Sequence, residues 1–237
     1  MDIYKVKSFK KIREQRQKEN NKKASDSLLT KCVNKKAITR MLETQRNAGL
    51  SEEEFYNRLK TDKPFCDAVA MYCAINASRQ GSTDEKQLIK GISEAFETWD
   101  LKISLNQSGK DTHVPIKDTG EVLSRREAKK KGYGKSDMLK SFDFEGKIKN
   151  KEFLGFAKIC TGDGGHQDNV FEETTSIIDW LNKHADSEKN YFILVDFEDN
   201  KPQQRVEDEL ISRIKKDNVF ICNHVEFQLK VSELYEQ

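Results

Sequence analysis

The order of strand-like and helix-like segments in the second half of the chain limits the fold more than any other feature. Residues 190–199 (NYFILVDFED) contain a run from Phe192 to Val195 that is apolar enough to be buried on both faces of a sheet. Two earlier strands are expected at 138–144 and 152–160, joined by the polar connection 145–151. Helices at 166–185 and 206–216 and a final strand at 219–229 complete the pattern, which predicts an α/β fold with a mixed β-sheet flanked by helices.

The first hundred residues have a helical pattern. Residues 25–49, 51–59, 65–78 and 83–99 each carry apolar residues at helical spacing, and Ser51 stands three residues before Glu54, as in a capping box. After Trp99 the pattern changes to short strands and turns, with a strand expected at 101–105. We therefore expect a helical N-terminal region at 1–100, serving DNA contact or dimerisation, and a core at 101–237, with both in one compact unit.

Composition excludes several classes of protein. Hydrophobic and charged residues each make up 35% of the 237 residues, and 13 Phe and 2 Trp suffice for a packed interior. No apolar run approaches the roughly 18 residues of a membrane span, and the first residues lack the pattern of a secretory signal, so a cytoplasmic protein without membrane contact is expected. The 5 cysteines form no C-x-x-C pair, which argues against structural zinc.

Positive charge is concentrated in two segments. The net charge of +2 hides +6 in residues 1–23 and +5 in residues 117–151, which leaves −9 for the rest. Such segregation suits binding to a polyanion, because lysine and arginine release counterions from phosphates. For residues 1–23 a solvated or frayed arm and nucleic-acid contact stay open alternatives.

The segment 135–173 brings together the residue types of a phosphodiester-cleaving site. An acid lies on or just before the first expected strand, either Asp137 or Asp143, and Lys158 lies near the end of the next strand. The two aspartates are six residues apart and share a strand face, so alternation does not choose between them. Carboxylates can hold Mg²⁺, and a lysine can position the attacking water.

These residues resemble the PD-(D/E)XK nuclease superfamily, and more narrowly the type II restriction endonucleases, over roughly residues 120–196. The resemblance implies Mg²⁺-dependent cleavage of double-stranded DNA. The acid that the family places two residues before the lysine would fall on Phe156, which cannot bind a metal. A branch of these enzymes places that carboxylate on the following helix, about fourteen residues after the lysine, and Glu172 stands at that distance from Lys158.

Other acids compete for these roles. Glu173 and Asp168 are neighbours of Glu172, and Glu145-Gly146-Lys147 is a second acid-x-Lys match. That tripeptide ranks lower because it falls in the expected polar connection. The resemblance thus implies a metal site of Asp137 or Asp143 with Glu172, and catalysis assisted by Lys158.

Two segments next to this site favour DNA contact. Glycines followed by a polar helix start offer free backbone amides and side-chain donors to phosphates or bases. A short basic helix leading into Asp137 favours a grip on the DNA backbone. The expected contacts are Gly164, Gly165, His166, Gln167 and Asn169 in the first segment and Arg125, Arg126, Lys129, Lys130 and Lys135 in the second.

The leading functional hypothesis is a type II restriction endonuclease that hydrolyses double-stranded DNA at a specific site. Symmetric cutting of a palindrome needs two copies of the site, which implies a homodimer. The alternatives are a nuclease of the same fold that acts on a DNA structure in repair or recombination, and a DNA-binding protein without catalytic activity.

Overall fold

The computed structural model describes residues 1–28, 35–47, 49–75, 80–108, 112–160, 166–198 and 203–237. The chain divides into two compact units. We call Met1–Phe9 with Gly81–Gln237 the core unit, and Lys10–Gln80 the helical unit. The boundary differs from the one expected near residue 100, because both the first nine residues and the helix before Trp99 pack with the sheet.

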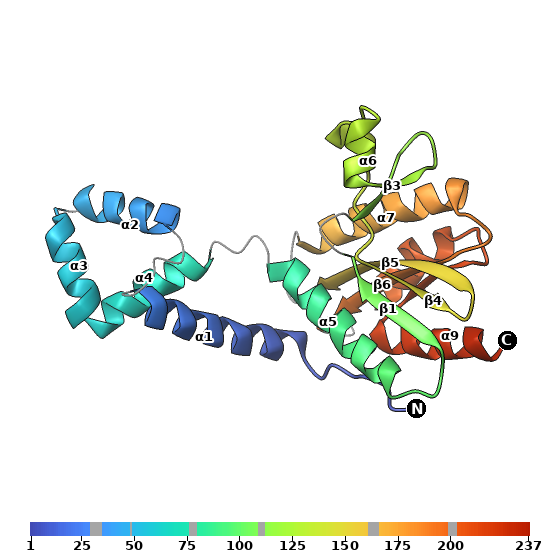
Figure 1. Ribbon diagram of the computed structural model, residues 1–237, viewed down its shortest axis with the longest axis horizontal. Helices are drawn as coiled ribbons and strands as arrows, with labels where there is room; N and C mark the ends of the chain where they lie inside the picture. The colour runs from blue at the N-terminus through green and yellow to red at the C-terminus, as the bar shows by residue number, and fades with distance from the viewer. Residues whose placement is uncertain (29–34, 48, 76–79, 109–111, 161–165, 199–202) are drawn as a thin grey trace. The chain divides into compact units, whose positions relative to one another are not determined.

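The core unit is built on a five-stranded sheet with the order β1-β4-β5-β6-β7 (Figure 1). β1, β4 and β5 pair antiparallel, whereas β5, β6 and β7 pair parallel. The sheet is therefore mixed, as predicted. Its strands are β1 (Ile103–Gln107), β4 (Phe144–Ile148), β5 (Lys151–Cys160), β6 (Asn190–Phe197) and β7 (Val219–Cys222).

Helices cover both faces of the sheet. α5 (Gln80–Glu97) and α9 (His224–Glu236) share one apolar cluster with Phe153 and Phe192 of the sheet. α7 (His166–His184) packs on the opposite face, where Phe156 and Ile193 belong to a second cluster. Because β6 contributes to both clusters, its continuous apolar run is buried on both faces, as predicted.

The hairpin β4–β5 lies further along the chain than predicted. The expected strand at 138–144 is not a strand up to Asp143, and the expected connection forms β4 instead. The chain turns at Lys149 and Asn150, where Lys149 takes a positive φ of 53°. Gly146 lies in mid-strand, where an added Cβ would be 2.0 Å from the Ser104 carbonyl oxygen of β1 and 2.4 Å from the Phe153 ring.

The expected final strand at 219–229 is also wrong beyond Cys222. Asn223 ends β7 and caps α9 by accepting hydrogen bonds from the amides of Val225 and Glu226, at 2.9 Å each. The Glu226 carboxylate accepts in return from the Asn223 amide, which completes a capping box. The Asn-x-x-Glu pattern thus starts a helix within an apolar segment that could also have continued as a strand.

The residues between β1 and β4 in the sequence form a small substructure beside the sheet. It contains the two-stranded sheet β2–β3, the predicted short basic helix α6 and the 3₁₀ turn η1. A capping box of Ser124 and Glu127 begins α6. The bounds are β2 (His113–Pro115), β3 (Val122–Ser124), α6 (Arg125–Lys130) and η1 (Lys135–Asp137).

The helical unit has its own core around Phe55, Leu59 and Val69. The capping box predicted from Ser51 and Glu54 is present. The helices are α1 (Phe9–Leu28), α2 (Lys35–Asn47), α3 (Glu52–Thr61) and α4 (Lys63–Ile75). In the described part of the chain, no helix has the length and apolar character needed to span a bilayer.

The remaining helical segments lie in the core unit between β6 and β7. They are α8 (Gln203–Glu209) and the 3₁₀ turn η2 (Ile211–Arg213), which together occupy most of the predicted helix 206–216. Leu210 between them is fully buried in the cluster on the α7 face.

Candidate functional site

Asp143 is fixed at the start of the hairpin by the strand beside it. It directly precedes β4, its amide donates to the Gly155 carbonyl at 2.7 Å, and its Oδ2 accepts from the Ala157 amide at 2.9 Å. The carboxylate therefore lies against the carboxyl-terminal part of β5, next to Lys158. Strand alternation left Asp137 and Asp143 as alternatives, and Asp143 is the aspartate that lies beside Lys158.

Lys158 is the centre of a charged cluster at the end of β5. Its side chain is 11% exposed, and its Nζ lies 2.7 Å from Glu173 Oε2 of α7 and 3.9 Å from Glu85 Oε1 of α5. The ammonium group lies over the ring of Phe156, whose centroid is 5.0 Å from Nζ. Two helices on different faces of the sheet therefore each present an acid to one buried ammonium group.

Two acids of the cluster, Glu85 and Asp143, have raised pKa values. Burial and the neighbouring charge of Asp143 raise the pKa of Glu85 to about 7. Burial also raises the pKa of Asp143 to about 6, although the Ala157 amide and Lys158 act in the opposite direction. Carboxyl groups with raised pKa values close to a lysine are characteristic of functional sites, although structural networks also show them.

Lys158 and Glu173 keep opposite charges. Burial lowers the pKa of Lys158, but its hydrogen bond with Glu173 and the charges of Glu85 and Asp143 outweigh this, so that the pKa is raised overall. Burial acts to raise the pKa of Glu173, yet its contacts with Lys158 and Lys140 leave it lowered. Lys140 Nζ lies 3.3 Å from Glu173 Oε1 and is more exposed, so a second cation flanks the cluster.

Two of the predicted site residues lie apart from this cluster. Asp137 belongs to η1, where its Oδ2 accepts from the Gly134 amide at 2.7 Å, so it stabilises a turn. Glu172 is exposed, whereas the adjacent Glu173 contacts Lys158. The acid of α7 that meets Lys158 is thus Glu173 and not the expected Glu172, because neighbouring helical side chains point about 100° apart.

Glu85 is the site residue that sequence analysis did not consider. It lies in the first turns of α5, which was interpreted as a core helix from its apolar stripe. Its side chain is 13% exposed, and low exposure of an acid is a signal that only coordinates provide. The distance of 73 positions between Glu85 and Lys158 leaves no local sequence pattern to detect.

The rival tripeptide lies elsewhere on the hairpin. Glu145 and Lys147 are in β4, and Glu145 Oε2 lies 2.8 Å from His113 Nδ1. Lys147 is exposed and lies 3.5 Å from Glu152. Among the described residues, the ion-pair partners of Glu145 and Lys147 are His113 and Glu152, and not Lys158. Phe156 is fully buried in the apolar cluster against α7.

The predicted DNA contacts fall into two groups. The first group is exposed on α6 and η1 and consists of Arg125, Arg126, Lys129, Lys130 and Lys135. In the second group, Gly164 and Gly165 and the side chains of His166 and Gln167 lie outside the described residues, while Asn169 is exposed on α7. Asp168 forms an ion pair with Arg205 at 3.0 Å, away from Lys158.

No ready-made metal group of three or more histidine, cysteine or acidic side chains occurs among the residues that the structure describes. The acids around Lys158 would have to hold a cation in pairs, with water or substrate as further ligands. Comparison with protein-family models, curated proteins and solved structures gave no match.

Proposed function

We propose that this chain is a Mg²⁺-dependent endonuclease that hydrolyses phosphodiester bonds of double-stranded DNA, with the PD-(D/E)XK type of core found in type II restriction endonucleases. The observation that carries the proposal is the buried ammonium of Lys158, held by Glu173 at 2.7 Å and Glu85 at 3.9 Å beside the carboxylate of Asp143. Three acids around one lysine at the end of a hairpin supply the groups that such chemistry needs.

The order of elements supports the same reading. A helix, three antiparallel strands, a helix and a parallel strand follow one another as α5, β1, β4, β5, α7 and β6. We take this arrangement to be the nuclease core that the sequence resembles. Asp143 stands before the second of the antiparallel strands and Lys158 near the end of the third. Fold alone does not imply activity, so the charged cluster around Lys158 is the feature that supports nuclease chemistry.

The cluster fits a hard divalent cation. The charge of Asp143 raises the pKa of Glu85, so the two carboxylates are close enough to repel. Mg²⁺ commonly binds through one or two carboxylates together with water and substrate phosphates. We therefore assign Asp143 and Glu85 as the metal-holding pair, with Glu173 as a third acid within the cluster. Such an ion would supply a positive charge beside the phosphate and lower the pKa of a bound water.

Lys158 has two roles in this proposal. As a cation it can donate hydrogen bonds to an attacking water and to a phosphate oxygen, which stabilises the charge that develops during the reaction. Glu173 keeps it charged and oriented, and Lys140 neutralises the other oxygen of Glu173. Phe156 cannot bind a metal, and its ring faces the ammonium group of Lys158.

DNA would be held through its backbone. The exposed cations of α6 and η1 lie on the substructure beside the sheet and are the proposed phosphate contacts. Phosphate contacts position a protein on DNA without reading the bases. Cutting both strands of a symmetric site would further require a homodimer, as proposed from the sequence.

The test is cleavage of plasmid and phage DNA by the purified chain, with and without Mg²⁺. Lys158→Met keeps the aliphatic stem and should abolish cutting while DNA binding persists. Lys147→Met, in the rival tripeptide, is the matched control and should cut normally. Discrete fragments from plain duplexes support a restriction enzyme, and cutting of branched DNA alone indicates the repair-type alternative. Salt-sensitive binding without cutting under any Mg²⁺ condition would reject the enzyme.

A further inference from the structure

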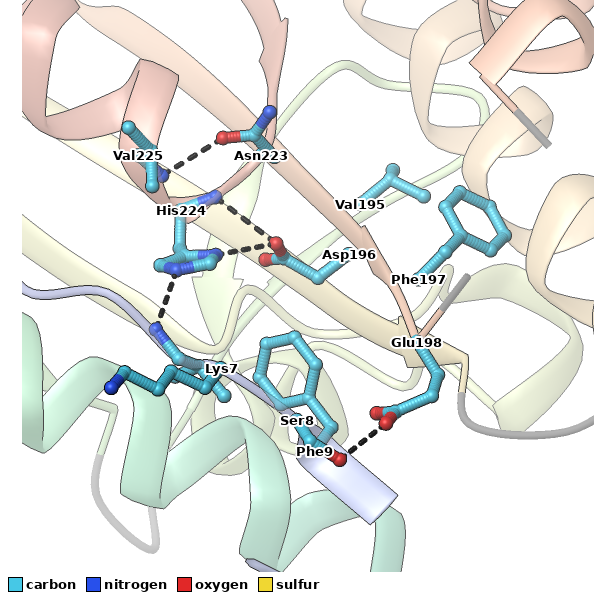
Figure 2. Close-up of a pocket in the computed structure, with 11 residues that line it drawn as sticks. Lys7, Ser8, Phe9, Val195, Asp196, Phe197, Glu198, Asn223, His224 and Val225 are labelled. Atoms are coloured by element: carbon cyan, nitrogen blue, oxygen red, sulfur yellow. Dashed lines mark hydrogen bonds and ion pairs between the residues drawn. The ribbon is translucent and has the colours of Figure 1, made fainter. Parts of the chain in front are cut away.

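A pocket of about 520 Å³ lies on the face of the sheet opposite to Lys158. In the parallel pair β5–β6, Lys158 is opposite Val195 and Ile159 is opposite Asp196, so Asp196 and Lys158 point to different faces. The pocket lies at the carboxyl ends of β6 and β7, beside the start of α9 (Figure 2). It is lined by residues 6–9, 195–198 and 223–225.

The N-terminal segment Met1–Phe9 forms one wall of this pocket, and we call it the strap. It is held along its length by hydrogen bonds from the core. Trp99 Nε1 donates to the Asp2 carbonyl at 3.1 Å, and the Gln228 side chain bonds both the amide and the carbonyl of Tyr4 at 2.9 Å. The Val6 amide donates to Nε2 of His224 at 3.1 Å. The strap is thus a fixed part of the pocket.

The contact with Val6 indicates which ring nitrogen of His224 carries the proton. Because Nε2 accepts a hydrogen bond, the ring proton is on Nδ1, which donates to Oδ1 of Asp196 at 2.6 Å. The His224 amide donates to the same oxygen at 3.3 Å. Both ring nitrogens of His224 are therefore engaged, one by the strap and one by Asp196.

Asp196 has an unused oxygen. The residue is 4% exposed, and within the described part of the chain its Oδ2 is buried with no hydrogen-bond partner. Figure 2 shows both contacts to His224 on one oxygen, while the other is turned toward the strap. A buried carboxylate oxygen without a partner is unfavourable, so a positively charged donor in the pocket would stabilise it.

The rest of the pocket combines a second acid with apolar walls. Glu198 follows Asp196 by two positions at the end of the same strand and accepts a hydrogen bond from Ser8 of the strap. Val6, Phe9, Val195 and Val225 supply the apolar surface. Carbon-lined walls between two acids suit an aliphatic chain with a cationic end better than a bare metal ion, which needs more oxygen ligands.

We propose that this pocket binds a small aliphatic cation that carries an ammonium or guanidinium group. The cationic end would donate to Asp196 Oδ2, and the chain would lie along the apolar walls toward Glu198. Lys7 of the strap also lines the pocket and opposes the binding of a cation. The site is separate from the proposed nuclease centre, so either proposal can fail without the other.

The experiment is isothermal titration calorimetry of the full chain with agmatine, at constant ionic strength. Saturable binding is expected in the wild type. Asp196→Asn keeps an acceptor for His224 but replaces the free oxygen by a donor, so it should weaken binding about tenfold or more. Glu198→Gln, which leaves the Asp196–His224 pair intact, should weaken binding as well and guards against misfolding of the first variant.

A substitution in the strap should strengthen agmatine binding instead of weakening it. Lys7→Ala should tighten agmatine binding about two- to threefold, because it removes a like charge from the pocket. Lys5→Ala, an exposed strap residue that does not line the pocket, should leave affinity unchanged. The proposal would be overturned by absence of saturable binding, by wild-type affinity for agmatine in the Asp196 and Glu198 variants, or by saturation with MgCl₂ in place of agmatine.

Discussion

Glu85→Gln should increase stability at alkaline pH while it removes Mg²⁺-dependent activity. Burial and the charge of Asp143 raise the folded-state pKa of Glu85 from 4.5 to about 7. Between these values the folded state binds more protons than the unfolded state, so stability falls as pH rises from 4.5 to 7 and stays lower above pH 7. At about 1.4 kcal/mol per pKa unit, the penalty in the wild type reaches at most ~3.5 kcal/mol.

Urea denaturation at pH 4 and pH 8.5 measures this effect. The wild type and Glu85→Gln should have similar stability at pH 4, and the variant should be more stable by ~1–3 kcal/mol at pH 8.5. Glu94→Gln, an exposed acid on the same helix, is the control and should change stability by less than about 0.5 kcal/mol.

Mg²⁺ provides the second half of the experiment. A cation held by Glu85 and Asp143 should stabilise the wild type at pH 8.5 in a concentration-dependent manner and should have much less effect on Glu85→Gln. Parallel pH profiles for the two proteins, or equal stabilisation of both by Mg²⁺, would refute the reasoning about this carboxyl group.

Three further results are expected. Glu173→Gln should lower Mg²⁺-dependent DNA cleavage at least about 100-fold in a plasmid assay, the scale of losing a group that supports charge stabilisation, whereas its exposed neighbour variant Glu172→Gln should change the rate less than about twofold. Lys129→Ala on α6 should reduce the slope of log K against log salt for duplex DNA by about 0.9, measured by fluorescence anisotropy; an unchanged slope means that this lysine does not contact phosphate. Gly155→Ala should destabilise the fold by at least ~1–3 kcal/mol in urea, because a Cβ would lie 1.8 Å from the Phe144 ring, while Gly134→Ala, with its nearest atom at 3.5 Å, should cost little.

Local physical chemistry explains which elements could be predicted. The apolar run in β6, the capping box at Ser51 and the apolar stripe of α7 are each encoded within a few neighbouring residues. The mixed sheet flanked by helices follows from the order of those segments. The predicted bounds of the hairpin were wrong because glycine is compatible with a turn and with a closely packed strand. At Gly146 the pairing with β1 and the packing of Phe153 select the strand.

The sequence by itself determined the chemistry that is available: Lys158 near the end of a strand, acids before and after it, and a separate basic segment. Tertiary structure decided which acids meet that lysine. Glu85 approaches from α5, Glu173 is chosen over Glu172 by the rotation of α7, and Asp143 is chosen over Asp137 by the register of β4 on β5. Residue types are carried by the chain, but a distance between side chains exists only once the helices have packed on both faces of the sheet.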